Sequence, residues 1–296
     1  MSTESVFVTG ATGFVGQRAA IAFREQGMRV TALVRASSDA ATVARLADAG
    51  VSIAVDAGDV PTLRDQLAAS GAPCVVHLAT RFVAEHRADE VEPLVHDNIA
   101  FGARLLEAMT ASEVTAIVHA GTAWQHYENR DYSPVSLYAA TKEAFAAIVR
   151  YYVEIRGVRA VGCEFTDMYG AGDTRKKVLW AMRNAVATGA ALSLSGGEQI
   201  VDLLHVTDAI AALRVATTRA MSAAAGTEER WAVRGSEPCT LRELVARFER
   251  VRSETVPVAW GARPYRARET FTPWTSGALL PGWAPRVTLD DGLRTL

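Results

Sequence analysis

The chain of 296 residues has few cysteines, few lysines, no excess of either charge and no long apolar run. Its 3 cysteines are far apart and odd in number, which excludes a disulfide framework and a CxxC metal site and predicts a reducing compartment. The 31 Lys+Arg residues against 33 Asp+Glu lack the basic excess of nucleic-acid-binding proteins. No stretch reaches the roughly 18 consecutive apolar residues that a membrane span requires.

The N-terminal residues, Met-Ser-Thr-Glu, lack the basic region of a secretory signal peptide. We therefore expect a cytoplasmic protein with no metal, nucleic acid or membrane as partner. Apolar residues make up 49% of the chain and charged residues 22%, as in ordinary globular proteins. A chain of this length can bury a large core without a disulfide or metal.

Short apolar segments alternate with longer helical patterns in the first half of the chain. Strands are expected at residues 5–9, 29–34, 51–55, 74–78, 115–119 and 159–163. Helices are expected at residues 15–26, 40–49, 61–70, 98–110 and 136–155. This order predicts βαβ units, and strands apolar on both faces predict a parallel sheet covered on both sides. The expected fold is therefore α/β, a Rossmann-type doubly wound parallel sheet.

The alternation fails after about residue 166, where glycine, proline and five of the six tryptophans lie. Residues 200–216 still show a strand followed by a helix. We predict a dinucleotide-binding domain of residues 1–165 together with about 200–218. A smaller, irregular C-terminal substrate domain is expected at about 166–199 and 219–296.

The first predicted strand runs into a glycine-rich turn. A tight strand-to-helix turn favours glycine, as does close approach of backbone N–H groups to a pyrophosphate. The helix that follows directs its N-terminus at the phosphates. This context predicts a dinucleotide-binding loop, with a purely structural turn as the alternative. The residues expected at the cofactor are Gly10, Thr12, Gly13, Phe14, Val15 and Gly16.

The end of the second predicted strand distinguishes NAD from NADP. An NAD site usually has an acid there for the ribose 2′-hydroxyl, whereas this chain has Arg35. A guanidinium suits a 2′-phosphate, and Ser37 can add a hydrogen bond. We therefore predict NADP(H), with a solvated loop arginine as the alternative.

Tyr138 and Lys142 stand four residues apart in a predicted helix, so they share one face. A phenol has a pKa of about 10, which a neighbouring ammonium lowers. Tyr138 could then exchange a proton with a substrate oxygen, and we predict that both residues are catalytic. Lysine is scarce here, with three in the chain, which favours this reading over a surface helix pair.

Thr122 follows the fifth predicted strand. Ligands of open parallel sheets lie beyond the carboxyl ends of the strands. Thr122 is therefore expected to bond the same substrate oxygen, unless it only bonds its own backbone.

Further motifs accompany these residues. They are Gly58-Asp59, HLAT at 77–80, Asn98, MYGAGD at 168–173, VDLLHVTDA at 201–209 and the ending at 280–293. Together they resemble the extended short-chain dehydrogenase/reductases, in the NAD-dependent epimerase/dehydratase group that acts on nucleotide sugars. The resemblance runs from the start to the end of the chain.

The resemblance implies roles for individual residues. Asp59 would contact the adenine amino group, and Tyr169 would flank the nicotinamide. Lys142 would also bond the nicotinamide ribose. Other residues implied at the cofactor are Leu78, Ala79, Thr80 and Asn98. Residues implied at the substrate are Thr80, Thr122, Ala123, Trp124, Lys177, Arg263 and Arg266.

Several positions depart from the group's pattern. Sugar dehydratases have two acids where this chain has Ala123 and Trp124, which argues against dehydration. Val201 stands where nucleotide-sugar enzymes usually have a diphosphate-binding arginine. Arg263, Arg266, Lys176 or Lys177 could supply that charge, although the two lysines could equally be surface residues.

On this resemblance we expect an oxidoreductase that uses NADPH to reduce a keto group of a nucleotide-linked deoxysugar. Such a 4-ketoreductase would use Tyr138 as proton donor. A nucleotide-sugar 4-epimerase with bound NAD and a reductase of a non-sugar carbonyl are the alternatives. A non-catalytic NADP sensor is a further alternative, against which the presence of both Tyr138 and Lys142 argues.

The resemblance also suggests a homodimer formed through the predicted helix that carries Tyr138. The partly apolar face of this helix would pack either on the sheet or on a partner. Its residues are Phe145, Ile148, Val149 and Tyr152.

Overall fold

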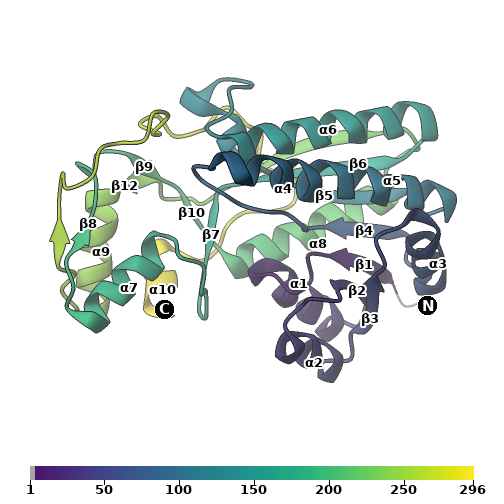
Figure 1. The fold of residues 1–296 in the computed structure, drawn as a ribbon, viewed down its shortest axis with the longest axis horizontal. Coiled ribbons are helices and arrows are strands. Elements are labelled where there is room, and N and C mark those ends of the chain that lie inside the picture. The colour runs from purple at the N-terminus through teal and green to yellow at the C-terminus, as the bar shows by residue number, and fades with distance from the viewer. Residues whose placement is uncertain (1–3) are drawn as a thin grey trace.

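The computed structural model describes residues 4–296 and contains a central sheet of seven parallel strands (Figure 1). Their order is β11-β6-β5-β4-β1-β2-β3. The strands are β1 (Ser5–Thr9), β2 (Arg29–Arg35), β3 (Ser52–Asp56), β4 (Cys74–His77), β5 (Ala116–Thr122), β6 (Arg159–Phe165) and β11 (Glu228–Val233). The strand order reverses between β1 and β4, the place where doubly wound sheets bind ligands. The expected Rossmann-type fold is thus confirmed.

Helices cover both faces of the sheet (Figure 1). They are α1 (Phe14–Glu25), α2 (Ala40–Asp48), α3 (Val60–Ser70), α5 (Phe101–Ala111), α6 (Leu137–Arg156) and α8 (Val206–Ser222). One core lies under α1 and α8. A second core lies under α3, α5 and α6 on the opposite face. Burial on both sides explains the continuous apolar strands.

The helix predicted from residue 98 begins earlier than expected. A short helix α4 (Val91–Val95) and a π-helical turn (His96–Ala100) precede α5. Pro93 lies in the first turn of α4, where the backbone N–H that proline lacks would have no acceptor within that helix.

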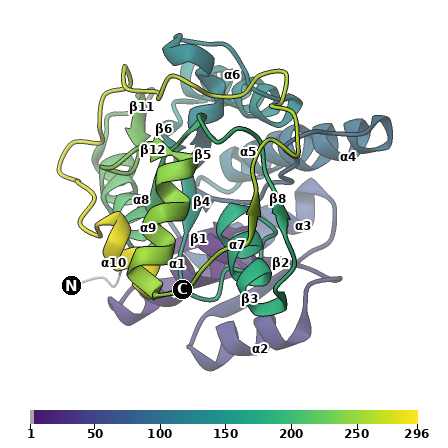
Figure 2. The same cartoon turned by 90° about the vertical axis from the view of Figure 1, so that its left-hand side faces the viewer.

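Several segments after residue 166 form a smaller region at one end of the sheet, which faces the viewer in Figure 2. Its helices are α7 (Val178–Thr188), α9 (Leu241–Arg252) and α10 (Leu289–Arg294), which share a third core. Its short strands are β7 (Asp167–Tyr169), β8 (Leu192–Ser193), β9 (Ile200–Val201), β10 (Leu203–His205), β12 (Cys239–Thr240) and β13 (Val258–Ala259).

Two details correct the predicted division of the chain. The strand β11 lies inside the range assigned to the substrate domain, yet it pairs with β6 as an edge strand of the main sheet. The helix α8 packs on the main sheet as expected, but β10 pairs with β7 instead of joining that sheet. The predicted boundary near residue 219 is therefore wrong for β11.

The apolar face of α6, expected to pack either on the sheet or on a second copy, packs mainly in the core of this chain. Phe145, Val149 and Tyr152 are buried in the core beneath α5 and α6, with Ile148 packed against them. Tyr151 and Ile155, on the other side of α6, remain 54% and 63% exposed.

Within residues 4–296, no helix combines the length and apolar character needed to span a bilayer. The same residues contain no group of three or more His, Cys, Asp or Glu side chains arranged to hold a metal ion. The prediction about the N-terminal segment rests in part on residues 1–3, which lie outside the described residues.

Candidate active site

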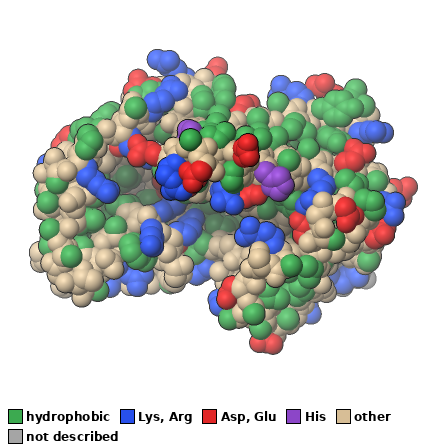
Figure 3. Space-filling view, viewed as in Figure 1, with side chains coloured by type: hydrophobic (Ala, Val, Ile, Leu, Met, Phe, Trp, Pro, Cys, Tyr) green, Lys and Arg blue, Asp and Glu red, His purple; other side chains and the backbone are tan. Residues whose placement is uncertain are grey.

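Two cavities meet at the carboxyl ends of the central strands. The larger, of about 1010 Å³, extends from the glycine-rich turn to Tyr138 and Lys142. The smaller, of about 330 Å³, lies between the sheet and the smaller region. Figure 3 shows this face hollowed, with Lys and Arg side chains gathered along the hollow. Residues that line both cavities are Phe82, Trp124, Thr166, Asp167, Met168, Lys176 and Lys177.

The glycine-rich turn forms one end of the larger cavity. Gly10 has a φ of +69°, and a Cβ there would lie 2.5 Å from the backbone nitrogen of Ala79. At Gly16 a Cβ would lie 2.1 Å from the carbonyl oxygen of Gly10. Side chains are thus excluded where the turn packs on itself and on the end of β4. All six residues predicted for this loop line the cavity.

The segment after β4 forms the adjoining wall. The Thr9 hydroxyl and His77 Nδ1 are 2.7 Å apart and join β1 to β4. Leu78, Ala79 and Thr80 line the larger cavity, as predicted for cofactor residues.

Asn98 lies behind this wall and does not line the cavity. Its Oδ1 accepts hydrogen bonds from the Thr80 hydroxyl (3.0 Å) and the Arg81 backbone N–H (2.7 Å). Its Nδ2 donates to Thr141 Oγ1 at 2.9 Å. Asn98 therefore holds the residues that line the cavity, and the structure does not bring its side chain to the cofactor space.

At the end of β2, Arg35 lines the larger cavity with an exposed side chain. Its backbone N–H donates to the Ser38 hydroxyl at 3.0 Å, which shapes the loop. Ser37 is exposed and does not line the larger cavity. The structure therefore does not place Ser37 with Arg35 in the space predicted for the cofactor.

Asp56, at the end of β3, lines the larger cavity, whereas Asp59 does not. Asp56 Oδ2 accepts a hydrogen bond from Arg104 Nη2 at 2.6 Å, and both residues line the cavity. Asp59 instead caps α3, where Oδ1 accepts from the Thr62 backbone N–H at 2.7 Å. Asp56 and Arg104 were missed by the sequence analysis, although Asp56 directly follows the strand predicted at residues 51–55.

The predicted catalytic residues come together in the larger cavity. Tyr138 and Lys142 lie on one face of α6, with Lys142 Nζ 5.8 Å from the Tyr138 ring centroid. Thr122 ends β5 and lines the same cavity. The Phe82 ring meets Tyr138 edge-on, with centroids 5.0 Å apart. A carbonyl group bound here would thus face the phenol of Tyr138, the hydroxyl of Thr122 and the aromatic ring of Phe82.

The acidity of Tyr138 differs from the expectation. Burial raises its pKa above the ordinary value, and the carboxylate of Asp167 adds to the rise. Burial alone lowers the pKa of Lys142 to about 8. In the ligand-free protein the pKa of Tyr138 therefore lies above its ordinary value and not below it as expected, because burial and Asp167 outweigh the hydrogen bond with Thr80 and the charge of Arg175. The phenol keeps its proton near neutral pH, as a proton donor requires.

The burial of Lys142 predicts a pH-dependent stability difference. Below about pH 8 the folded protein buries a charged ammonium, while between about pH 8 and 10.5 only the unfolded chain keeps that proton. The contribution of Lys142 to stability thus rises with pH in this window. A Lys142→Met variant should exceed the wild type in free energy of unfolding at pH 7. We expect this advantage to shrink by on the order of 2 kcal/mol at pH 9.5, measured by urea unfolding of the ligand-free proteins. A constant advantage would contradict the assignment.

The smaller cavity has aromatic walls. Its aromatic lining residues are Phe82, Trp124, Tyr127, Tyr169, Trp180 and Trp274. Lys177 Nζ lies 4.9 Å from the Phe82 ring centroid, and the Arg266 guanidinium lies 5.1 Å from that of Trp124. Apolar faces and cations therefore alternate around this space.

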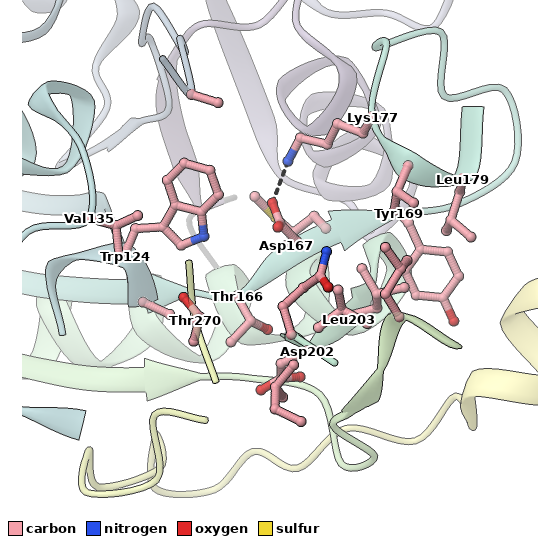
Figure 4. A pocket seen from close by; sticks show the side chains of 18 of the residues that line it. Trp124, Val135, Thr166, Asp167, Tyr169, Lys177, Leu179, Asp202, Leu203 and Thr270 are labelled. Carbon is pink, nitrogen blue, oxygen red and sulfur yellow. Dashed lines mark hydrogen bonds and ion pairs between the residues drawn. The ribbon is translucent and has the colours of Figure 1, made fainter. Parts of the chain in front are cut away.

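Each of the two cations is paired with a carboxylate. Lys177 Nζ donates to Asp167 Oδ1 at 2.6 Å (Figure 4). Arg266 Nη2 donates to Glu269 Oε1 at 2.7 Å. Both cations line the cavity, where a diphosphate could join these pairs through charge-assisted hydrogen bonds.

Two predicted residues lie elsewhere. Tyr169 lines the smaller cavity and not the larger one, because β7 turns away from the main sheet to pair with β10. Arg263 is exposed and lines neither cavity of residues 4–296, since its backbone N–H donates to Leu194 O at 3.1 Å. Ala123 and Trp124 line the smaller cavity as expected.

The larger cavity suits a nicotinamide dinucleotide. A turn without side chains lies at one end, where α1 begins, and can receive a pyrophosphate. Arg35 and Asp56 lie at the ends of adjacent strands, and Tyr138 and Lys142 lie farther along the lining. The roles predicted for these residues follow the geometry but stay predictions.

Comparison with known proteins agrees with this geometry. The model of the NAD dependent epimerase/dehydratase family matches residues 6–228. UDP-glucuronate 4-epimerase 1 of Arabidopsis thaliana is 30% identical over 216 residues, which cover 67% of this chain and 50% of that protein. A dTDP-glucose 4,6-dehydratase of Mycobacterium tuberculosis is 29% identical over 223 residues, covering 71% of this chain and 67% of that protein. The chain thus spans about half the length of the first of these relatives.

Solved structures show the same fold. MoeE5 in complex with UDP-glucose and NAD superposes with a TM-score of 0.81 at 22% identity, covering 98% of this chain and 96% of that one. A UDP-glucuronic acid 4-epimerase mutant from Bacillus cereus gives a TM-score of 0.83 at 19% identity, with 98% and 97% covered. The match of the family model over most of the chain confirms the expected resemblance: this protein belongs to the NAD dependent epimerase/dehydratase family.

Proposed function

We propose that the protein is an oxidoreductase that uses NADPH to reduce a keto group of a nucleotide-linked deoxysugar. The observation that carries the cofactor preference is Arg35, which ends β2 in the lining of the larger cavity where NAD sites usually have an acid. Tyr138, with a raised pKa, supports the direction of reduction, because it holds the proton that a new alkoxide needs.

NADPH bound in the larger cavity would supply a hydride to the carbonyl carbon. Thr122 donates a hydrogen bond to the carbonyl oxygen and orients it. Tyr138 then gives its proton to the same oxygen as negative charge develops there. The ammonium of Lys142 lies near the Tyr138 ring and stabilises the phenolate left behind. The Phe82 ring packs against both Trp124 and Tyr138 beside this point.

The substrate class follows from the smaller cavity. Lys177 and Arg266 provide cations for a diphosphate, in place of the arginine absent at Val201. Trp124, Val135 and Leu203 offer apolar surface that suits a deoxygenated sugar better than a fully hydroxylated one. Relatives named for UDP-glucuronate, dTDP-glucose and UDP-glucose support a nucleotide sugar. Ala123 and Trp124 leave no acid at the positions that dehydration would use.

The cofactor preference tests the proposal through Arg35. An Arg35→Asp variant should bind NADPH about 100-fold more weakly than the wild type, because charge-assisted bonds to the 2′-phosphate are replaced by repulsion. NADH affinity should change by only a fewfold, since NADH has no such phosphate. Titration calorimetry with both cofactors measures the two constants. Equal losses for both cofactors would remove the basis for NADPH.

A nucleotide-sugar 4-epimerase with bound NAD is the second candidate. Asp56 favours it. Asp56 at the end of β3 pairs with Arg35 at the end of β2, and its carboxylate could accept a hydrogen bond from a ribose hydroxyl. The Asp56 carboxylate accepts one hydrogen bond from Arg104 Nη2 at 2.6 Å and another from the Gly58 backbone N–H at 3.0 Å. Tightly bound NAD in the purified protein would favour the epimerase over the reductase.

The homodimer stays a prediction. Tyr151 and Ile155 are the exposed apolar side chains that α6 offers to a second copy. Sedimentation of the full chain would decide between monomer and dimer.

A further inference from the structure

A partly buried cluster of charged side chains connects the two cavities. At its centre is Arg230 of β11, whose side chain is 26% exposed. Its Nη1 and Nη2 donate to Glu143 of α6 at 2.9 and 2.7 Å. Its Nη2 also donates to Glu164 of β6 at 2.5 Å. Arg230 thus ties three elements together, yet it lines neither cavity formed by residues 4–296.

One branch of the cluster reaches the proposed catalytic site. Glu143 Oε2 accepts a hydrogen bond from Gln125 Nε2 at 2.6 Å. Gln125 is fully buried, and its Oε1 accepts from the Thr122 backbone N–H at 2.9 Å. Glu143 also follows Lys142 directly on α6. The position of Thr122 therefore depends on Glu143, which Arg230 holds by two hydrogen bonds.

The other branch reaches the wall of the smaller cavity. Glu164 Oε2 lies 3.3 Å from His126 Nε2. The His126 ring is stacked on Trp274, with centroids 4.2 Å apart and planes 5° from parallel. Both rings line the smaller cavity. Arg234 Nη1 donates to the Trp274 carbonyl at 2.9 Å and fixes the backbone of this wall.

Such a cluster contributes little to stability, since buried ion pairs gain about as much as they lose by desolvation. It does fix geometry, because Arg230, Glu143 and Gln125 each form hydrogen bonds with two other residues. Displacing reacting groups by about 1 Å can lower a rate about 100-fold. We propose that Arg230 is a positioning residue that sets Thr122 through Glu143 and Gln125, and the Trp274 wall through Glu164 and His126. The inference rests on the proposed function for the identity of the ligands.

The test compares three variants in the full chain. Gln125→Met breaks the first branch alone, and we expect kcat about tenfold lower with unchanged affinity for UDP-glucose. Arg230→Met breaks both branches, and we expect a similar loss in kcat together with about fivefold weaker UDP-glucose binding. Arg219→Met is the matched control, because Arg219 forms a bidentate pair with Glu229 of β11 at 2.9 Å that leads to neither cavity. It should leave kcat and affinity unchanged.

Turnover is measured with whichever reaction the wild type performs, NADPH oxidation by a 4-keto-6-deoxy nucleotide sugar or interconversion of UDP-sugars. A wild type that only interconverts UDP-sugars overturns the proposed reduction and leaves this comparison intact. UDP-glucose affinity, by calorimetry, needs no turnover. If Arg230→Met does not fold, Arg230→Lys keeps the charge without the two-pronged contact and should show both losses at a near-wild-type Tm. A folded Arg230 variant that matches Arg219→Met in kcat and affinity overturns the proposal.

Discussion

A Tyr138→Phe variant should lose about 10²- to 10⁴-fold in kcat while binding NADPH as the wild type does. The size of the loss is that of a general acid in the transition state. Phenylalanine keeps the ring that packs edge-on against Phe82 and removes only the phenolic O–H. Steady-state kinetics and calorimetry on the same preparation separate the two effects.

Phe82→Leu is a useful control for this experiment. It removes the aromatic contact to Tyr138 but leaves the phenol, so its kcat should stay well above that of Tyr138→Phe. An unchanged kcat in Tyr138→Phe would show that another group gives the proton.

A Gly10→Ala variant should lose cofactor binding and about 2–5 kcal/mol of stability. An alanine at a φ of +69° costs roughly 1–2 kcal/mol. Its Cβ would also lie 2.5 Å from the backbone nitrogen of Ala79, so the turn or the end of β4 must shift, at a cost of about 1–3 kcal/mol. Denaturant unfolding and NADPH titration measure the two losses.

The chain offers a matched control in Gly27. It has a φ of +87°, and a Cβ there would have nothing within 4 Å. Gly27→Ala should therefore show the backbone cost alone, roughly 1–2 kcal/mol, with normal cofactor binding. Equal stability losses in the two variants would mean that close packing at Gly10 is not what requires glycine.

The strands and helices of the first half could be predicted because burial on both faces leaves an unbroken apolar signal. Observed strand ends differ from the predicted ones by a few residues, as at Thr122, which extends β5 beyond residue 119. The edge strand β11 gives no such signal, since Glu228, Glu229 and Arg230 begin it. Their charges are paired with side chains from α6, α8 and β6, and of these α6 and β6 are distant in sequence.

The residues of the candidate site were likewise predictable only in part. The Gly10 turn, Tyr138 and Lys142 have local spacing that reports their chemistry, and they line one cavity as predicted. The Gly58-Asp59 motif points to Asp59, which caps α3, because a motif does not distinguish a helix cap from an acid that lines a cavity. Phe82 lines both cavities. This position depends on how the loop after β4 folds, which the local sequence does not reveal.

The most direct measurement of the central claim is NADPH consumption by the purified chain with dTDP-4-keto-6-deoxyglucose, followed by loss of reduced-cofactor absorbance and analysis of the sugar product. We expect consumption that depends on the sugar, equals the alcohol formed and falls about 10²- to 10⁴-fold in Tyr138→Phe. Release of tightly held NAD from the protein, with interconversion of UDP-sugars and no NADPH consumed, would contradict this expectation.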